Sequence, residues 1–274
     1  MSRQRMGQHF LGDPAWQQRI YATLPRPDRE TWIEIGAGHG EMTALLAEHA
    51  RRLIAIEGDE LLVPGLRERA ARKWLNVEVV AGDVLELDLA RWMNEASEAD
   101  IGSDIGGGAQ GCRVYGNLPY YITSPILHKL FESAAKIASA HIVIQLEVAE
   151  RIVARPGCRD YGYLSVACQY YAKPEIALKI PPGAFRPPPK VHSALVHLAM
   201  PGERAELGIA SDARFLDFIK MCFEQKRKTL RNNLREVAPS DRVHAAMSAY
   251  GVREDARAEQ LSLREFAALF RELL

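Results

Sequence analysis

Short apolar runs alternate with amphipathic stretches through the first two-thirds of the chain. The runs that have strand length and turn residues at their ends are residues 32–35, 53–56, 77–80, 114–116 and 141–144. Between them, residues 41–50 and 61–73 carry apolar side chains at helical spacing. This alternation is typical of a doubly wound α/β sheet, in which mostly parallel strands have helices on both faces.

Two further strands are expected at residues 176–180 and 191–198, joined by the proline-rich loop at residues 181–189. A hairpin-like pair at this place would give the mostly parallel sheet an antiparallel edge. Earlier in the chain, residues 100–111 are rich in glycine, with Gly107 near their centre. Such a composition buries too little apolar surface to order itself, so we expect a flexible surface insertion there.

The composition becomes helical after the Met-Pro-Gly sequence at residues 200–202. Apolar residues recur at three- and four-residue spacing from Phe215 to Leu234, and two more helices are expected at residues 242–249 and 262–273. Ser262 followed by Glu265 resembles a capping box at the start of the last helix. The expected organisation is an α/β domain at residues 1–200 and a small all-helical domain at residues 201–274.

The bulk composition is that of an ordinary globular protein of 274 residues, 47% hydrophobic and 26% charged. No stretch approaches the roughly 18 consecutive apolar residues that span a bilayer, and the basic N-terminus lacks the apolar run of a secretory signal. The 4 cysteines are scattered without a CxxC pair, which argues against a zinc site and a disulfide framework. We expect a cytoplasmic monomer with no metal and no membrane association.

The formal net charge is +0, but the charge is segregated along the chain. Six basic residues and a single acid, Glu224, lie between Ile219 and Arg235, whereas residues 86–104 hold six acids and one arginine. Arg227, Arg231 and Arg235 recur every four residues, which would place them on one face of a helix. A neutral chain of this kind can still present a phosphate-binding face to a nucleic acid.

Candidate binding residues follow the first three strands. Glycines at positions 36, 38 and 40 come where the first strand gives way to a helix, and they let the backbone approach a ligand closely. Glu57 follows the second strand, where an acid can bind two ribose hydroxyls. Asp83 follows the third strand, where a carboxylate can accept a hydrogen bond from an adenine amino group.

The fourth strand ends in the most informative segment, Asn117, Leu118, Pro119 and Tyr120. The side-chain oxygen of Asn117 and the carbonyl of Leu118 can accept both hydrogens of a base amine, because Pro119 stiffens the backbone that aims them. Tyr120 offers a face on which an unstacked base can lie. A dehydrogenase that uses nicotinamide would share the glycine loop and Glu57, but only a methyltransferase accounts for Asp83 and Asn117 as well.

The chain resembles S-adenosyl-L-methionine-dependent methyltransferases, and more narrowly the ribosomal RNA adenine dimethyltransferases, over nearly its whole length. The segments that carry the resemblance are GQHFL at residues 7–11, EIGAGHG at 34–40, IE at 56–57, GDV at 82–84, NLPYYITSP at 117–125, FRPPPKV at 185–191 and EQKRKTLRN at 224–232. The resemblance implies a Rossmann-like methyltransferase sheet, a catalytic domain at residues 1–200 and a basic helix in an RNA-binding domain at residues 201–274.

The resemblance also implies the residue roles. Cofactor contacts are expected at His9, Leu11, Gly36, Glu57, Asp83 and Asn117. RNA contacts are expected at Lys226, Arg227, Lys228 and Arg231. Asn117 and Leu118 are expected to hold the target amine, and we hypothesise that Tyr120 stacks on one face of the base while Phe185 closes on the other.

The implied substrate is a pair of adjacent adenosines in a hairpin near the 3′ end of small-subunit (16S) rRNA, within a pre-30S particle, each dimethylated on its exocyclic nitrogen. Two alternatives stay open at this point. One is a large-subunit rRNA adenine methyltransferase of the macrolide-resistance type, although residues 225–232 favour the small-subunit branch. The other is an RNA-binding assembly factor that retains the fold without catalysis, against which the intact set of Glu57, Asp83 and Asn117 argues.

Overall fold

The structure is a computed structural model that describes residues 8–25, 30–100 and 111–274, so most of the predicted glycine-rich insertion lies outside the described residues. The chain forms two compact units. The first contains residues 1–149 and 175–200, and the second contains residues 150–174 and 201–274. One break therefore falls at the boundary expected after residue 200, whereas the assignment of residues 150–174 to the second unit was not expected from the sequence.

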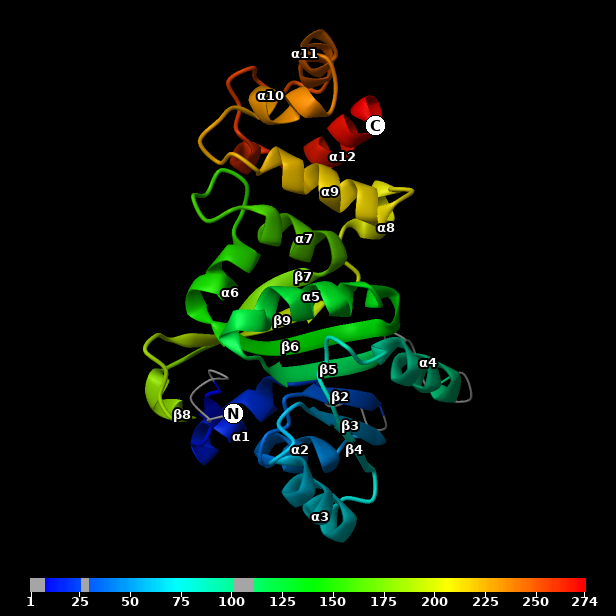
Figure 1. Cartoon of the computed structure of the whole chain (residues 1–274), viewed down its shortest axis with the longest axis vertical. Helices are drawn as coiled ribbons and strands as arrows, with labels where there is room; N and C mark the ends of the chain where they lie inside the picture. The colour runs from blue at the N-terminus through cyan, green and yellow to red at the C-terminus, as the bar shows by residue number, and fades with distance from the viewer. Residues whose placement is uncertain (1–7, 26–29, 101–110) are drawn as a thin grey trace. The chain divides into compact units, whose positions relative to one another are not determined.

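A seven-stranded sheet is the framework of the first unit, and Figure 1 shows its strands stacked beside one another. In spatial order the strands are β4 (Val77–Ala81), β3 (Arg52–Glu57), β2 (Thr31–Ile35), β5 (Cys112–Asn117), β6 (Ile137–Gln145), β9 (Ser193–Ala199) and β7 (Lys173–Ile180). The pairs from β4 to β6 are parallel, and β9 runs antiparallel to β6. The expected mostly parallel sheet with an antiparallel edge is thus confirmed.

The strand order reverses beside β2, because β3 lies on one side of it and β5 on the other. Ligands of open α/β sheets bind outside the carboxyl ends of the strands at such a switch point. Ile35 and Gly116 are register partners at this place, so the segments that follow them leave the sheet side by side. The topology alone therefore puts the glycine loop next to Asn117.

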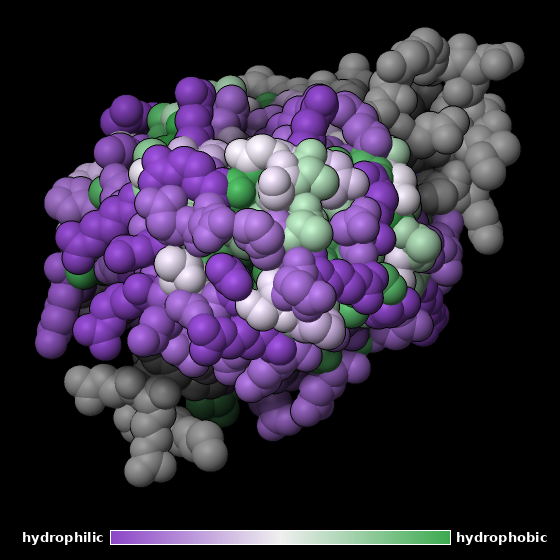
Figure 2. Space-filling view, turned by 90° about the horizontal axis from the view of Figure 1, so that it is seen from above, coloured by the Kyte–Doolittle hydropathy of each residue, from purple (hydrophilic) through white to green (hydrophobic). Residues whose placement is uncertain are grey.

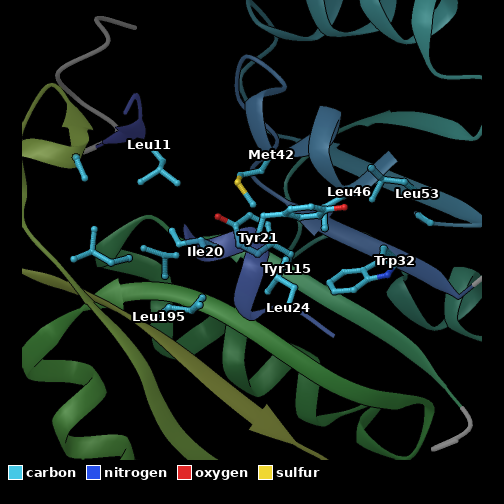
Figure 3. Packing of buried hydrophobic residues seen from close by; sticks show 14 of the residues in the cluster. Leu11, Ile20, Tyr21, Leu24, Trp32, Met42, Leu46, Leu53, Tyr115 and Leu195 are labelled. Carbon is cyan, nitrogen blue, oxygen red and sulfur yellow. The ribbon is translucent and has the colours of Figure 1, made fainter. Parts of the chain in front are cut away.

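Helices pack on the sheet and anchor its faces. Those that begin in the first unit are α1 (Pro14–Thr23), α2 (Glu41–Ala47), α3 (Val63–Lys73), α4 (Leu89–Asp100), α5 (Thr123–Phe131) and α6 (Leu146–Val153). Figure 3 shows side chains of α1 and α2, such as Tyr21 and Met42, packed with Trp32 and Tyr115 from the strands. This core fixes the strand ends from which the functional side chains project.

A two-stranded ribbon joins the N-terminal arm to the proline-rich loop. In it β1 (Phe10–Leu11) pairs antiparallel with β8 (Phe185–Arg186), and the amide of Gly12 donates to the carbonyl of Ala184. A Cβ at Gly12 would lie 2.7 Å from Cγ of Arg186, so the close approach of the two segments requires glycine there. The arm is consequently held beside the carboxyl ends of the strands.

The second unit is helical, as expected. Its helices are α7 (Tyr163–Tyr171), α8 (Arg204–Leu207), α9 (Asp212–Cys222), α10 (Leu230–Asn233), α11 (Ser240–Ala249) and α12 (Leu263–Leu273). The predicted capping box is present, because Ser262 N donates to Glu265 Oε2 at 2.7 Å and Glu265 N donates to Ser262 Oγ at 3.3 Å. The face of the molecule in Figure 2 is mainly hydrophilic.

The prediction that the basic residues lie on one face of a single helix is wrong. Helix α9 ends at Cys222, turns occupy residues 223–228, and α10 covers only Leu230–Asn233. The side-chain nitrogen of Asn233 donates to the carbonyl of Cys222 at 2.6 Å, which folds the chain back on itself. Arg227 and Arg231 therefore do not share a continuous helix face. No helix in the described part of the chain is long and apolar enough to cross a membrane.

Candidate functional site

An open pocket of about 920 Å³ lies at the carboxyl ends of the parallel strands in the first unit. Its lining comes from the N-terminal arm and from the segments that follow β2, β3, β4 and β5. Seven of the predicted site residues line it, namely His9, Gly36, Glu57, Asp83, Asn117, Leu118 and Tyr120.

The glycine loop and Glu57 form one side of the pocket. Gly36 and Gly38 have φ values of 75° and 58°, which side chains with a Cβ rarely adopt. Glu57 Oε2 accepts from the amide of Gly38 at 2.6 Å, and Oε1 accepts from the amide of Asp59 at 2.8 Å. Both carboxylate oxygens are thus held in place with lone pairs left over, which suits them to accept two neighbouring hydroxyl groups.

Asp83 lies at the outer end of the same pocket and is exposed. Its Oδ1 accepts from the amide of Leu85 at 2.9 Å, which closes a local turn and fixes the side chain. No described residue donates to Oδ2, which stays free to accept from an amino group of a ligand. Glu57 and Asp83 therefore offer acceptors in the order that a ribose followed by an adenine would need.

Asn117 is oriented from the opposite side by the N-terminal arm. Its Nδ2 donates to the main-chain oxygen of His9 at 2.8 Å. A carbonyl can only accept, so the amide nitrogen must face His9 and Oδ1 must face away from it. Among the described residues none donates to Oδ1. The amide oxygen of this lining residue is therefore available as an acceptor.

The residues after Asn117 build the wall next to it. The amide of Leu118 donates to the carbonyl of Val143 at 3.0 Å, which ties this turn to β6 and leaves the Leu118 carbonyl without a partner among the described residues. Pro119 has φ −58° and ψ 130° and precedes a short 3-10 turn at Tyr120–Ile122. The ring of Tyr120 lies 5.5 Å from the ring of His9 between centroids. Two acceptors and an aromatic ring thus meet at one end of the pocket.

Two of the predicted site residues are placed differently. Phe185 is 0% exposed and packs in the hydrophobic core, so the hypothesis that its ring closes on a base is wrong for this structure. The reason is the pairing of β1 with β8, which turns the side chain inward. Leu11 packs in the same core, as Figure 3 shows, and its carbonyl accepts from Gln17 Nε2 at 2.6 Å. Leu11 lines only a smaller hollow beside the main pocket.

Residues to which the sequence assigned no individual role also line the pocket. Among them are Gln8, Phe10, Asp59 and Tyr121. Tyr121 is 65% exposed, so it presents a large aromatic surface at the pocket rim. Its place directly after Tyr120 in the segment NLPYYITSP was the available signal, since a second aromatic residue there could also meet a base.

Glu34 is a buried acid beside this site. It lies in β2, is 1% exposed, and Oε2 accepts from Thr43 Oγ1 at 2.6 Å. Burial is the main cause that raises the pKa of Glu34 from 4.5 to about 8, and the charges of Glu57 and Glu41 raise it further, whereas the Thr43 bond opposes the shift. The residue is therefore protonated at neutral pH and acts as part of the core rather than as a charged ligand.

The predicted RNA-binding residues belong to the second unit. Lys226, Arg227 and Lys228 are exposed, and Lys226 Nζ donates to the carbonyl of Arg159 at 2.7 Å. Arg231 is half-buried, donates to Ser240 Oγ and lies 3.6 Å from Glu254. The charge of Arg231 is therefore partly neutralised. Among the described residues, no acid pairs with Lys226, Arg227 or Lys228. The described residues hold no group of three side chains that could bind a metal ion.

Comparisons with known proteins show the family of the chain. A family model described as ribosomal RNA adenine dimethylase matches residues 1–274. A protein of Acidobacterium capsulatum named ribosomal RNA small subunit methyltransferase A is 44% identical over 270 residues, which cover 98% of this chain and 90% of the relative. A protein of Koribacter versatilis with the same name is 42% identical over 271 residues, 98% of this chain and 93% of the relative.

Two solved structures are similar over most of their length. The 23S rRNA methyltransferase ErmE is 28% identical, with a TM-score of 0.69, and the match covers 96% of this chain and 99% of that one. A dimethyladenosine transferase from Plasmodium falciparum has a TM-score of 0.74 at 22% identity, and the match covers 95% of this chain and 96% of that one. The second likeness supports the fold alone.

Proposed function

The chain belongs to the ribosomal RNA adenine dimethylase family, and from this premise we propose that it dimethylates the exocyclic amines of two adjacent adenosines in a 3′-terminal hairpin of small-subunit (16S) rRNA. The methyl donor is S-adenosyl-L-methionine, which supplies an electrophilic methyl group on a sulfonium centre. The proposed partner is a pre-30S particle, on which the protein acts as a cytoplasmic monomer during small-subunit biogenesis. The observation that carries the proposal is the amide of Asn117, a lining residue of the pocket, whose nitrogen donates to His9 and whose oxygen has no donor among the described residues.

The pocket residues fit the proposed cofactor. Glu57 holds two fixed carboxylate oxygens for ribose hydroxyls, and Asp83 keeps Oδ2 for an adenine amine. The glycine loop brings backbone close to the same place, since the amides of Gly36 and Ala37 donate to the carbonyl of Ile56 at 2.9 and 3.1 Å. Glu57 and Asp83 offer acceptors, so these groups select a nucleoside by the hydrogen-bond donors that it presents.

The target amine would be held by Asn117 and Leu118. An adenine amine is a weak nucleophile because its lone pair is delocalised into the ring. Two acceptors on its hydrogens favour a more tetrahedral nitrogen and stabilise the positive charge that develops on it. The residues thus act by placement and electrostatics, and no general base is needed, since the nitrogen becomes acidic after transfer.

Tyr120 would position the flipped base by stacking. Its ring lines the pocket on the same side as Asn117, and stacking of a base on an aromatic ring is worth about 1–3 kcal/mol. Phe185 does not supply the second face, because it is buried in the core. The exposed ring of Tyr121 at the pocket rim is the aromatic group in reach of an incoming nucleotide.

The relatives favour the small subunit as substrate. Proteins named for the small-subunit activity are 35–44% identical to this chain, whereas the 23S rRNA methyltransferase ErmE is 28% identical. A catalytically inactive assembly factor would have no need of the oriented Asn117 amide. This feature supports an enzyme.

The proposal is tested by transfer of labelled methyl groups to small ribosomal subunits that lack the modification. Two methyl groups on each of two adjacent adenosines are expected with the wild-type protein, and almost none with Asn117→Ala. Transfer to protein-free large-subunit rRNA instead would contradict the proposed substrate. Retention of the cofactor without transfer to either substrate would favour the assembly factor.

A further inference from the structure

The hydroxyl of Tyr120 is held from behind by a serine of the neighbouring strand. Tyr120 Oη lies 2.6 Å from Ser193 Oγ, and Ser193 is 0% exposed. Ser193 is the first residue of β9, where it pairs in register with Gln145 of β6. The partner of the phenol is therefore part of the rigid sheet and not of a loop.

This bond limits the positions that the Tyr120 ring can take. A tyrosine side chain has two rotatable bonds, and an anchored hydroxyl fixes the far end of the ring. The ring remains half-buried at the pocket, and burial raises the pKa of the phenol, so Tyr120 stays neutral and able to donate. A neutral ring whose hydroxyl is anchored keeps its place at the pocket, so less side-chain entropy is lost when a base stacks on it.

The segment that precedes Ser193 anchors a second group of the site. Nδ1 of His9 lies 2.8 Å from the carbonyl of Pro187, so it donates to that oxygen, and the ring of His9 faces the ring of Tyr120. The main-chain oxygen of His9 in turn accepts from Asn117. Residues 185–193 thus hold two groups that line the pocket, His9 and Tyr120, which gives this proline-rich segment a role although Phe185 does not line the pocket.

We propose that Ser193 is a positioning residue, which sets the ring of Tyr120 at the distance from Asn117 that a stacked adenine requires. This inference rests on the proposed function, because it assigns Ser193 a part in the same methyl transfer. The second transfer depends on it more than the first. After one methylation the amine keeps a single hydrogen, so one acceptor contact is lost and stacking must hold the base in place.

Ser193→Ala and Tyr120→Phe remove the same hydrogen bond from its two ends. Each is expected to lower kcat on undermethylated small subunits by about 3- to 10-fold, the loss that one neutral hydrogen bond supports. Each should also raise the share of monomethyladenosine in the product. The kcat of the double variant is expected to be no lower than that of either single variant, because each single change already removes the whole hydrogen bond. The affinity for S-adenosyl-L-methionine, measured by calorimetry, should change by less than about 2-fold.

Ser139→Ala is the matched control. Ser139 is also a buried, hydrogen-bonded serine of this sheet, but it lies at the other end of the β6–β9 pair, where its register partner is Ala199. It should lower the unfolding temperature while the ratio of mono- to dimethylated product stays that of the wild type. An equal change of that ratio in Ser139→Ala would mean that Ser193 acts only through stability, and would overturn the proposal.

A second readout does not depend on methyl transfer. In protein with ¹³C-labelled tyrosine, the ring resonances of Tyr120 should shift in Ser193→Ala, because the phenol loses its hydrogen-bond partner. Unchanged Tyr120 resonances would refute the anchoring whether or not the protein methylates RNA. Wild-type protein that shows the anchored ring but transfers no methyl groups would instead refute the proposed function.

Discussion

The side-chain nitrogen of Asn117 lies 2.8 Å from the main-chain oxygen of His9, although the two residues are 108 positions apart in the chain. His9 directly precedes β1, which is paired with β8, so the orientation of the Asn117 amide depends on the N-terminal arm being in place. The arm thereby couples the cofactor pocket to the group that would hold the target amine. Deleting the arm would therefore remove the hydrogen-bond partner of the Asn117 amide as well as part of the pocket lining.

Asn117→Asp tests this orientation. An aspartate keeps an acceptor oxygen for the base but has no amide hydrogen for His9, and its second oxygen would repel the His9 carbonyl. Methyl transfer to small subunits is expected to fall by about 100-fold, comparable to the loss of one group that stabilises charge in a transition state. Asn76→Asp is the control, because Asn76 donates to two helix-end carbonyls away from the pocket. An equal loss in both variants would refute the specific role of Asn117.

Glu57→Gln should weaken the cofactor more than it weakens the fold. The amide of glutamine would direct a donor at the amide of Gly38 or Asp59, each of which now donates to a carboxylate oxygen. Loss of charge-assisted hydrogen bonds predicts a rise in the Kd for S-adenosyl-L-methionine of about 10-fold or more. Calorimetric titration measures it. Glu60→Gln changes an exposed acid three residues on and should leave the Kd unchanged.

Phe185 is expected to behave as a core residue. Phe185→Ala should destabilise the protein by about 3–5 kcal/mol, as large-to-small changes in a packed core do. Phe185→Leu keeps most of the volume and should retain methyl transfer within about 3-fold of wild type, with a smaller loss of stability. Chemical denaturation and the methyl-transfer assay separate the two effects. A Phe185→Leu variant that folds as stably as wild type but transfers no methyl groups would restore the stacking hypothesis.

The sheet could be predicted because each of its strands is a local apolar run with turn residues at its end. The predicted strand at residues 53–56 corresponds to β3 (Arg52–Glu57), and that at residues 77–80 to β4 (Val77–Ala81). Ligand residues then follow from topology, because the ends of parallel strands meet at one edge. Glu57, Asp83 and Asn117 needed no knowledge of side-chain contacts to be placed together.

The parts of the fold and site that could not be predicted depend on contacts between distant residues, which leave no local pattern in the sequence. The pairing of β1 with β8 joins strands of 2 residues each from opposite ends of the first unit. That pairing buries Phe185, so a sequence motif alone could not show which way its ring points. The bond from Asn233 to Cys222 likewise breaks the basic segment into turns, although its charge spacing fits a helix.

Glu34 predicts a pH dependence of stability. Because burial raises its pKa from 4.5 to about 8, the folded protein keeps a proton that the unfolded chain releases. Stability should therefore fall as the pH rises through this interval. His141, whose pKa burial lowers to about 3, contributes a pH dependence only below its ordinary value of 6.5. Denaturant titrations between about pH 6.5 and 8 isolate Glu34, and Glu34→Gln should flatten the slope there. If the dependence of stability on pH persists in Glu34→Gln, another titratable group causes it.

The last prediction concerns the exposed cations Lys226, Arg227 and Lys228 of the second unit. If they contact RNA phosphates, their replacement by glutamine should weaken binding to small subunits and reduce the slope of log Kd against log salt by about 2 units. The affinity for S-adenosyl-L-methionine should not change, because the cofactor pocket is lined by the first unit alone.

A charge-matched variant decides between local contact and net charge. Arg67, Arg72 and Lys73 are exposed on α3 in the first unit, and their replacement by glutamine lowers the net charge by the same amount. A general attraction between protein and RNA would weaken equally in both triple variants, since it depends on total charge at distances near the Debye length. Direct phosphate contacts would weaken only in the first. If the salt slope is unchanged when Lys226, Arg227 and Lys228 are replaced, this segment does not contact RNA phosphates.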